Sequence, residues 1–266
     1  MSPVFPHAPS SPARVWWWRL PLTYTPADLA LLSPAERDRV DRTRSTRAKA
    51  SLVVTRARAR RVLGELLGVP PRRIRLGRAP CPCCDAPDQG PPVVLHPGGA
   101  PRISLSHTTG CAALAVCEGP VGVDVEERRP LPVSTLAAST LTPGEAEHLA
   151  DMPAGPGRDA AFLRCWTRKE AVLKAVGTGI TSDLTVLETL PGSSGPVRVE
   201  AGAHPAAPRP WSVTDLPLPA PWTASLATPH GTPGPPLVTR YGDSVLTPDG
   251  GTAPLTPPSA ARPGAT

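Results

Sequence analysis

Two acidic side chains on one short segment have the types and spacing to bind a divalent cation. In Gly-Val-Asp-Val-Glu, strand alternation places Asp124 and Glu126 on one face and valines on the other. Two carboxylates at positions i and i+2 of a strand lie about 7 Å apart, which is close enough to share one metal ion. Without a cation they would repel each other, so a solvated acidic strand face is the alternative interpretation. On this motif alone both interpretations stay open.

A second segment adds a third carboxylate and an ammonium group. Residues 158–176 predict a helix that is closed by glycine. On its helical wheel, Glu170 lies on the apolar side between Trp166 and Leu173, and Lys174 follows one turn later. A carboxylate that faces a core must be paired, protonated or bound to a metal. Either Glu170 and Lys174 form an internal ion pair, or Glu170 is a metal ligand with a phosphate-binding lysine beside it.

The basic residues are unevenly divided between arginine and lysine. The chain has 28 basic and 22 acidic residues and a net charge of +6, and only three of the basic residues are lysines: Lys49, Lys169 and Lys174. A compact ammonium differs chemically from a rigid guanidinium fork, so two lysines within six residues indicate a specific use, with chance as the alternative. The positive charge favours an anionic partner, which can be phosphate, nucleic acid or an acidic protein face.

The remaining elements must position these residues. Apolar periodicity predicts helices at 44–67, 143–150 and 158–176 and strands at 15–20, 111–117, 121–126, 211–216 and 222–226, and residues 102–110 predict a strand that runs into a turn. Residues 77–101 are rich in proline, glycine and cysteine and predict a loop. Residues 1–13 are expected to be loose, and residues 229–266 are expected to form a disordered tail.

Two further groups could contact an anion. Ser106 and His107 stand where a strand runs into a glycine-containing turn, and both can donate hydrogen bonds to phosphate oxygens. In the helix at 44–67, Arg56 falls in the middle of the apolar side and Arg60 at its edge, so each either snorkels to solvent or reaches a bound anion. A nucleophile elbow, a Walker sequence and a G-x-G-x-x-G motif are all missing from the chain.

The cysteines and the first residues bear on the compartment. The chain has six cysteines in no recognisable disulfide spacing, and it starts with no apolar core of signal-peptide length. We therefore expect a cytoplasmic protein with reduced thiols and no membrane span. Cys81, Cys83 and Cys84 are crowded together, and ligands at such spacings surround a tetrahedral metal poorly.

Three motifs taken together resemble a known family. Ser-Leu-Ser-His at 104–107, Gly-Val-Asp-Val-Glu at 122–126 and Trp-Thr-Arg-Lys-Glu-Ala-x-x-Lys at 166–174 are similar, in order and separation, to the Sfp-type 4′-phosphopantetheinyl transferase family. The resemblance covers about residues 15–228. It implies an α/β (α+β) fold of two similar halves, 14–118 and 119–228, related by a pseudo-twofold axis. Coenzyme A and Mg²⁺ are then expected in the cleft between the halves.

The resemblance also implies roles for individual residues. The magnesium-binding carboxylates would be Asp124, Glu126 and Glu170. Lys174 would contact the pyrophosphate, and Ser106 and His107 would contact phosphate. Glu145 resembles an acidic residue near the reacting serine, and it shares with Glu170 the candidacy for the general base. The basic stretch Arg44–Arg60 resembles the region that grips the nucleotide 3′-phosphate, with Lys49, Arg56 and Arg60 as its candidate contacts.

One departure from the family pattern concerns the nucleotide. A Gly-Lys/Arg-Pro element is replaced here by Gly90-Pro91-Pro92, which brings no cation. Arg78 or Arg102 could substitute for it, or coenzyme A could bind less tightly.

The implied function is a Mg²⁺-dependent transfer of the phosphopantetheine arm of coenzyme A to a serine of an acyl or peptidyl carrier protein. The carrier is expected to be acidic and the enzyme monomeric, and neither nucleic acid nor membrane is expected as a partner. A non-catalytic relative that binds coenzyme A or the carrier is one alternative. A nucleic-acid-binding module on Arg37–Arg61 is another, disfavoured because its arginines surround the helix and no aromatic residues are interleaved with them.

Overall fold

Two four-stranded sheets form the centre of the molecule in the computed structural model, which describes residues 10–178, 183–200 and 210–242. The strands of the first sheet have the order β10-β1-β5-β4 and span Leu237–Arg240, Arg14–Arg19, Cys111–Cys117 and Arg102–Thr108. Those of the second have the order β6-β9-β8-β7 and span Gly122–Glu127, Trp222–Pro229, Pro210–Asp215 and Val197–Glu200. A separate hairpin pairs β2 (Arg75–Arg78) with β3 (Pro92–His96).

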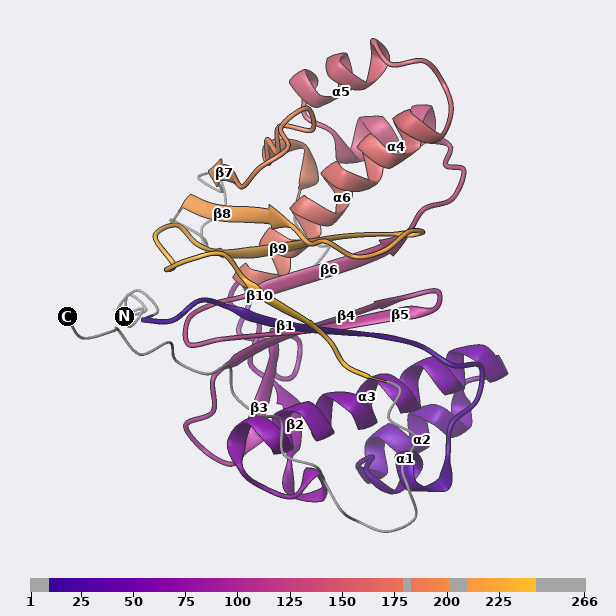
Figure 1. The fold of residues 1–266 in the computed structure, drawn as a ribbon, viewed down its shortest axis with the longest axis vertical. Helices are drawn as coiled ribbons and strands as arrows, with labels where there is room; N and C mark the ends of the chain where they lie inside the picture. The colour runs from indigo at the N-terminus through magenta and orange to yellow at the C-terminus, as the bar shows by residue number, and fades with distance from the viewer. Residues whose placement is uncertain (1–9, 179–182, 201–209, 243–266) are drawn as a thin grey trace, which may run out of the picture.

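Helices cover the outer face of each sheet, and the inner faces meet (Figure 1). The first sheet carries α1 (Pro26–Ala30), α2 (Pro34–Arg42) and α3 (Thr46–Leu67), and the second carries α4 (Val133–Thr140), α5 (Pro143–Ala150) and α6 (Pro156–Val176). The shared core joins Val15 and Trp17 of β1 to Val123 and Val125 of β6 and Leu226 of β9. The predicted α/β (α+β) fold class is confirmed.

The two sheets also meet along a polar seam between their edge strands, β4 and β6. The backbone N–H groups of Val123, Val125 and Glu127 donate hydrogen bonds to side-chain hydroxyls of β4, over 3.0, 3.4 and 3.3 Å. The accepting residues are Ser104, Ser106 and Thr108. Side chains of one strand thus satisfy the edge N–H groups of the other, which would otherwise need water or a further strand.

Helix α6 lies very close to β6 because of one glycine. A Cβ atom built on Gly122 would lie 1.9 Å from the carbonyl oxygen of Ala171, a distance that no side chain can occupy. This contact brings the acidic face of β6 against α6, which ends where Gly177 adopts the left-handed conformation. None of the described helices combines the length and apolar character needed to cross a membrane.

Two sequence predictions on the chain's organisation are wrong in part. The predicted loop at 77–101 contains β3 and the end of β2. The predicted disordered tail contains β10, which pairs in parallel with β1, and Tyr241, whose ring packs edge-on against Trp18. The four residues of β10 lie between proline- and glycine-rich stretches, so only their pairing with β1 stabilises them as a strand. At the other end, Ser10 hydrogen-bonds to Glu118, whereas residues 1–9 and 243–266 lie outside the described residues.

We predict that β10 is needed for stability. A chain that ends after residue 236 should lose about 2–4 kcal/mol of unfolding free energy relative to one that ends after residue 242, because Trp18 loses its aromatic partner and β1 loses a neighbour. Denaturant unfolding would measure the difference. Tyr241→Phe is the matched control and should lose only the 2.8 Å hydrogen bond to Glu65, worth about 0.5–1.5 kcal/mol. Equal stability of the two chains would contradict the assignment.

Candidate active site

Three carboxylates meet where α6 crosses the polar seam. Asp124 and Glu126 point from β6 toward α6, and Glu170 points back from the helix. Asp124 and Glu170 are 3% and 5% exposed, so the predicted core-facing orientation of Glu170 is confirmed. The hydroxyl of Ser106 donates to Asp124 over 2.9 Å, and that of Thr108 donates to Glu126 over 3.3 Å.

Lys174 joins this cluster across the seam. Its Nζ lies 2.5 Å from Oδ1 of Asp124 and 3.0 Å from Oγ of Ser106. The ion pair of Lys174 is therefore with a carboxylate on β6, and not the pair within the helix that was the alternative interpretation for Glu170. A compact ammonium on a flexible stem fits between these two oxygens, where a planar guanidinium would not.

The carboxylates raise one another's pKa. Burial and, to a smaller extent, the negative charges of Asp124 and Glu126 together raise the pKa of Glu170 to about 7, against the opposing effect of Lys174. Burial also raises the pKa of Glu126, and Asp124 adds to that increase. Several negative charges crowded in a desolvated place are stable only with added positive charge or bound protons.

Two oxygens of the cluster have no hydrogen-bond partner although they are buried: Oδ2 of Asp124 and Oε1 of Glu170. Buried carboxylate oxygens without donors are costly, and a hard cation with oxygen ligands would satisfy both. Within residues 10–178, 183–200 and 210–242, no three metal-ligating side chains already stand at the spacing of a bound ion. The donor set nevertheless fits a divalent cation of the Mg²⁺ type, which selects carboxylate oxygens.

A cavity of about 350 Å³ opens beside the cluster, between the two halves of the molecule. We call it the nucleotide cavity, after the ligand that the sequence resemblance predicts for this cleft. Glu170 and Lys174 line one side, and three arginines from different elements line the other, namely Arg39 of α2, Arg56 of α3 and Arg78 of β2. His107 also lines the cavity, and partial desolvation lowers its pKa, as do the charges of Lys174 and Arg56. The cavity therefore combines a strongly positive wall with the acidic cluster.

Arg78 places a cation beside the Gly90-Pro91-Pro92 segment, which has none of its own. Gly90, Pro91 and Pro92 line the nucleotide cavity together with Arg78, which pairs with Pro92 across the β2–β3 ladder. Arg102 is not part of the cavity lining, so Arg78 is the better placed of the two substitutes considered from the sequence. Thr55, which is 3% exposed, also lines the cavity with an unpartnered hydroxyl.

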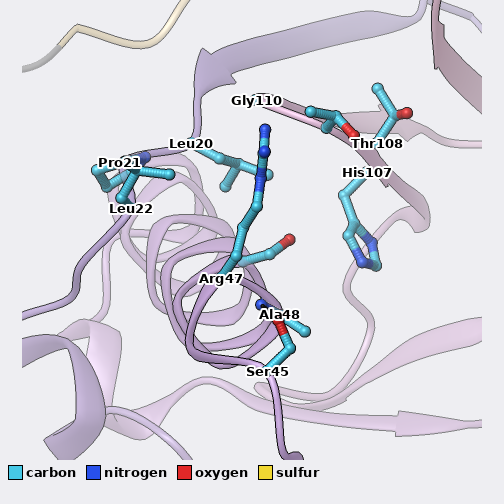
Figure 2. Close-up of a pocket in the computed structure, with 11 residues that line it drawn as sticks. Leu20, Pro21, Leu22, Ser45, Arg47, Ala48, His107, Thr108 and Gly110 are labelled. Atoms are coloured by element: carbon cyan, nitrogen blue, oxygen red, sulfur yellow. Dashed lines mark hydrogen bonds between the residues drawn. The ribbon is translucent and has the colours of Figure 1, made fainter.

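A second cavity, of about 360 Å³, adjoins the first at His107. Leu20 and Leu22 line one side and Thr108 the other, and the side chain of Arg47 extends between them (Figure 2).

Two of the predicted nucleotide contacts lie elsewhere. The prediction for Arg60 is wrong because its side chain is 3% exposed and donates to Glu36 over 2.7 Å and to the carbonyl of Ile74 over 3.3 Å. Lys49 shares the helix face of Arg56, two turns earlier, but it lines neither cavity. Arg39 was missed because its place depends on how α2 packs on α3, which periodicity does not reveal.

Glu145 lies apart from the cluster, in a buried network of its own. It is fully buried, its carboxylate is 2.6 Å from Nζ of Lys169, and it accepts hydrogen bonds from Thr189 and from the backbone N–H of Thr142. Lys169 also donates to the carbonyl of Leu184. Its oxygens are occupied and it has no exposed surface, which favours a structural role for Glu145 over the predicted role near the reacting serine.

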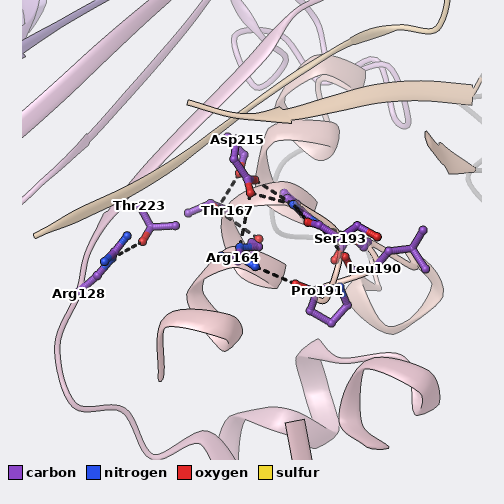
Figure 3. A network of polar contacts seen from close by, with 11 residues as sticks. Arg128, Arg164, Thr167, Leu190, Pro191, Ser193, Asp215 and Thr223 are labelled. Atoms are coloured by element: carbon purple, nitrogen blue, oxygen red, sulfur yellow. Dashed lines mark hydrogen bonds and ion pairs between the residues drawn. The ribbon is translucent and has the colours of Figure 1, made fainter. Parts of the chain in front are cut away.

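A neighbouring network fixes α6 on its other side (Figure 3). The guanidinium of Arg168 is fully buried, binds both oxygens of Asp215 over 2.9 and 2.8 Å, and donates to the carbonyls of Thr189, Leu190 and Ser193. Arg164 adds a hydrogen bond to the carbonyl of Pro191. The loop after η3 (Leu184–Val186) is thereby held against the helix that carries Glu170 and Lys174.

Comparisons with known proteins agree with this geometry. A sequence profile of the 4′-phosphopantetheinyl transferase superfamily matches residues 120–227, which include all three carboxylates and Lys174. HetI, a 4′-phosphopantetheinyl transferase of Nostoc sp., is 31% identical over 175 residues, covering 63% of this chain and 70% of HetI. AcpT, a 4′-phosphopantetheinyl transferase of Salmonella typhimurium, is 39% identical over 127 residues, covering 46% and 64%. The predicted family and transferase class are confirmed, and the chain belongs to the 4′-phosphopantetheinyl transferase superfamily.

Proposed function

We propose that this protein transfers the 4′-phosphopantetheine arm of coenzyme A to a serine of an apo carrier protein, with Mg²⁺ in the carboxylate cluster. The observation that carries the proposal is the pair of buried, unpartnered oxygens on Asp124 and Glu170, next to Lys174 and an arginine-lined cavity. Asp124, Glu126 and Glu170 would hold the ion. When bound, Mg²⁺ would neutralise the pyrophosphate oxygens as negative charge develops on them.

The nucleotide end of coenzyme A would occupy the nucleotide cavity. Arg39, Arg56 and Arg78 offer fixed positive charge for its 3′-phosphate, and the hydroxyl of Thr55 offers a donor. His107 faces the same space, and a bound phosphate would favour its protonated form. The pantetheine arm would then extend past His107 into the second cavity, whose wall combines hydroxyls with leucine side chains.

The chemical step exchanges one phosphoester bond for another. The carrier serine oxygen forms a bond to the phosphorus that bears pantetheine, and the bond from that phosphorus to the bridging oxygen breaks. The electron pair leaves with 3′,5′-ADP, and Lys174 donates a hydrogen bond to the leaving oxygens. We assign the serine proton to Glu170, because its carboxylate lines the nucleotide cavity beside Lys174, where the reacting phosphate would bind.

The surface near the site is positively charged, which complements the proposed acidic carrier. Arg42 and Arg44 are exposed at the junction of α2 and α3, and Arg47, which is also exposed, lines the second cavity. Complementary charge steers an acidic partner and sets its orientation.

The direct experiment incubates the protein with coenzyme A, Mg²⁺ and a panel of apo carriers from fatty-acid, polyketide and peptide synthesis, and detects the added arm by intact mass. If no carrier gains the arm, or if transfer is undiminished after chelation by EDTA, the proposal fails.

The metal assignment predicts that Asp124→Asn abolishes transfer while preserving the fold. Asparagine keeps the shape of the side chain but removes its negative charge. The single-turnover rate should therefore fall by more than about 10²-fold, the scale of losing one contact to the transition state. Glu127→Gln is the matched control, because strand alternation turns Glu127 away from the cluster, and its rate should stay near that of the unmodified protein. Normal activity of Asp124→Asn at ordinary Mg²⁺ concentrations would show the assignment to be wrong.

The role of Lys174 predicts that Lys174→Ala lowers the rate by about 10²–10³-fold. Lys174→Arg should also be impaired, because a planar fork cannot occupy the place of the ammonium between Asp124 and Ser106. Single-turnover rates would be measured beside thermal melts. A purely structural lysine would instead tolerate arginine and leave both rates near normal.

The structural role of Glu145 predicts a loss of stability without a specific loss of rate. Glu145→Gln should cost about 3–5 kcal/mol, because it leaves the ammonium of Lys169 buried and unpaired. Adding Lys169→Met removes that charge and should recover most of the loss. The folded double variant should then transfer at a near-normal rate. A well-folded double variant with a rate reduced more than about tenfold would restore Glu145 as a candidate base.

A further inference from the structure

The cysteine-rich loop between β2 and β3 is the motif that the proposed transfer reaction does not use. Cys81, Cys83 and Cys84 form no disulfide, and the last two are exposed, whereas Cys81 is 9% exposed. The loop makes a single tight turn here, because the N–H of Asp85 donates to the carbonyl of Cys81 over 2.9 Å and the N–H of Cys81 donates to Ala86 over 2.9 Å. Asp85 adopts a positive φ of 54°, which closes the turn.

This turn directs several donors at one sulfur. The backbone N–H groups of Cys83 and Cys84 hydrogen-bond to Sγ of Cys81, and the thiols of Cys84 and Cys83 do so as well. These contacts lower the pKa of Cys81. In contrast, slight desolvation raises the pKa of the exposed Cys83, and the neighbouring sulfurs of Cys81 and Cys84 also raise it. The turn therefore favours the thiolate of Cys81 over that of Cys83.

The loop is tied to the nucleotide cavity. Two backbone hydrogen bonds close the base of the loop. The N–H of Gly90 donates to the carbonyl of Ala79 over 2.8 Å, and the N–H of Ala79 donates to the carbonyl of Pro91 over 2.9 Å. A Cβ on Gly177 would lie 2.7 Å from Pro91 and 3.5 Å from Pro82, so both prolines pack against the end of α6, three residues after Lys174. Pro82 stands between Cys81 and Cys83, so the cysteine turn is next to this contact in the chain.

We propose that Cys81 is a site of thiol–disulfide exchange with small-molecule disulfides such as oxidised glutathione, and that Cys84 is its resolving thiol. The Cys81 thiolate attacks one sulfur of the disulfide, which forms a mixed disulfide and releases one glutathione thiolate. Cys84 then attacks Sγ of Cys81, which closes an internal disulfide, releases the second glutathione and gives one proton to solvent. Cys84 is favoured over Cys83 as the resolving thiol because residues three apart in a helical turn lie on the same side.

The experiment treats the reduced full-length protein with oxidised glutathione, blocks the remaining thiols with N-ethylmaleimide and maps the products by mass spectrometry. We expect one internal disulfide between Cys81 and Cys84. In Cys84→Ser, a glutathione adduct should accumulate on Cys81, whereas Cys83→Ser should close the disulfide like the unmodified protein. A first adduct on Cys83 or Cys84, or a Cys83→Ser variant that fails to close the disulfide, would overturn the proposal.

A second measurement uses the unmodified chain, so it does not depend on how the variants fold. Iodoacetamide should label Cys81 before Cys83 near neutral pH, although Cys83 is the more exposed, because the thiolate is the reacting form. Cys111 and Cys165 are internal controls, since burial raises their pKa to about 12, and they should stay unlabelled in the folded protein. Labelling in the order of exposure would refute the proposal. So would uptake of one Zn²⁺ per chain by these thiols with resistance to oxidised glutathione, because the loop would then be a metal site.

Discussion

The architecture depends on the hydrogen bonds that join the edge strands β4 and β6 through side chains. If the two edges paired by backbone alone, the sheets would fuse and leave no room for a cleft. Hydroxyls at alternate positions of β4 keep the strands apart by the length of a short side chain and still satisfy the N–H groups of β6. The intervening residues Ile103 and Leu105 face α3 and its core. The alternation of small hydroxyl and apolar residues in Ser-Leu-Ser is therefore a structural requirement of the seam as well as a feature of the site.

Helix α6 carries charged residues into two separate buried environments. Successive residues on a helix are turned by about 100°, so Lys169 and Glu170 cannot share one environment. Lys169 pairs with Glu145 and anchors α5, whereas Glu170 joins Asp124 at the seam. This separation explains why two of the chain's three lysines lie in one short stretch. Each occupies a space that admits a compact ammonium: one fully enclosed beside Glu145, and one between Asp124 and Ser106.

Periodicity predicted the parts of the site that are local in sequence. The alternation in Gly-Val-Asp-Val-Glu placed Asp124 and Glu126 on the correct face, and the helical wheel placed Glu170 inside. The partners could not be predicted in this way, because they are set by packing between distant elements. The ion pair of Lys174 comes from another strand and that of Arg60 from another helix. Strand β10 was missed for the same reason, since four residues form a strand only where β1 offers an edge.

The positive wall of the nucleotide cavity shows how one position can compensate for another. In the family that the sequence resembles, a cation follows the glycine of the Gly-Lys/Arg-Pro element, whereas Pro91 stands there in this chain. Proline cannot contribute charge, but here its ring packs on Gly177 and its carbonyl closes the base of the loop. Arg78 reaches the same cavity from the partner strand of the hairpin, where it faces Pro92. Arg78 thus brings a cation to this cavity from the opposite strand of the hairpin. The loop has no ligand-binding side chain at this position. Its prolines instead pack against the end of α6, three residues after Lys174.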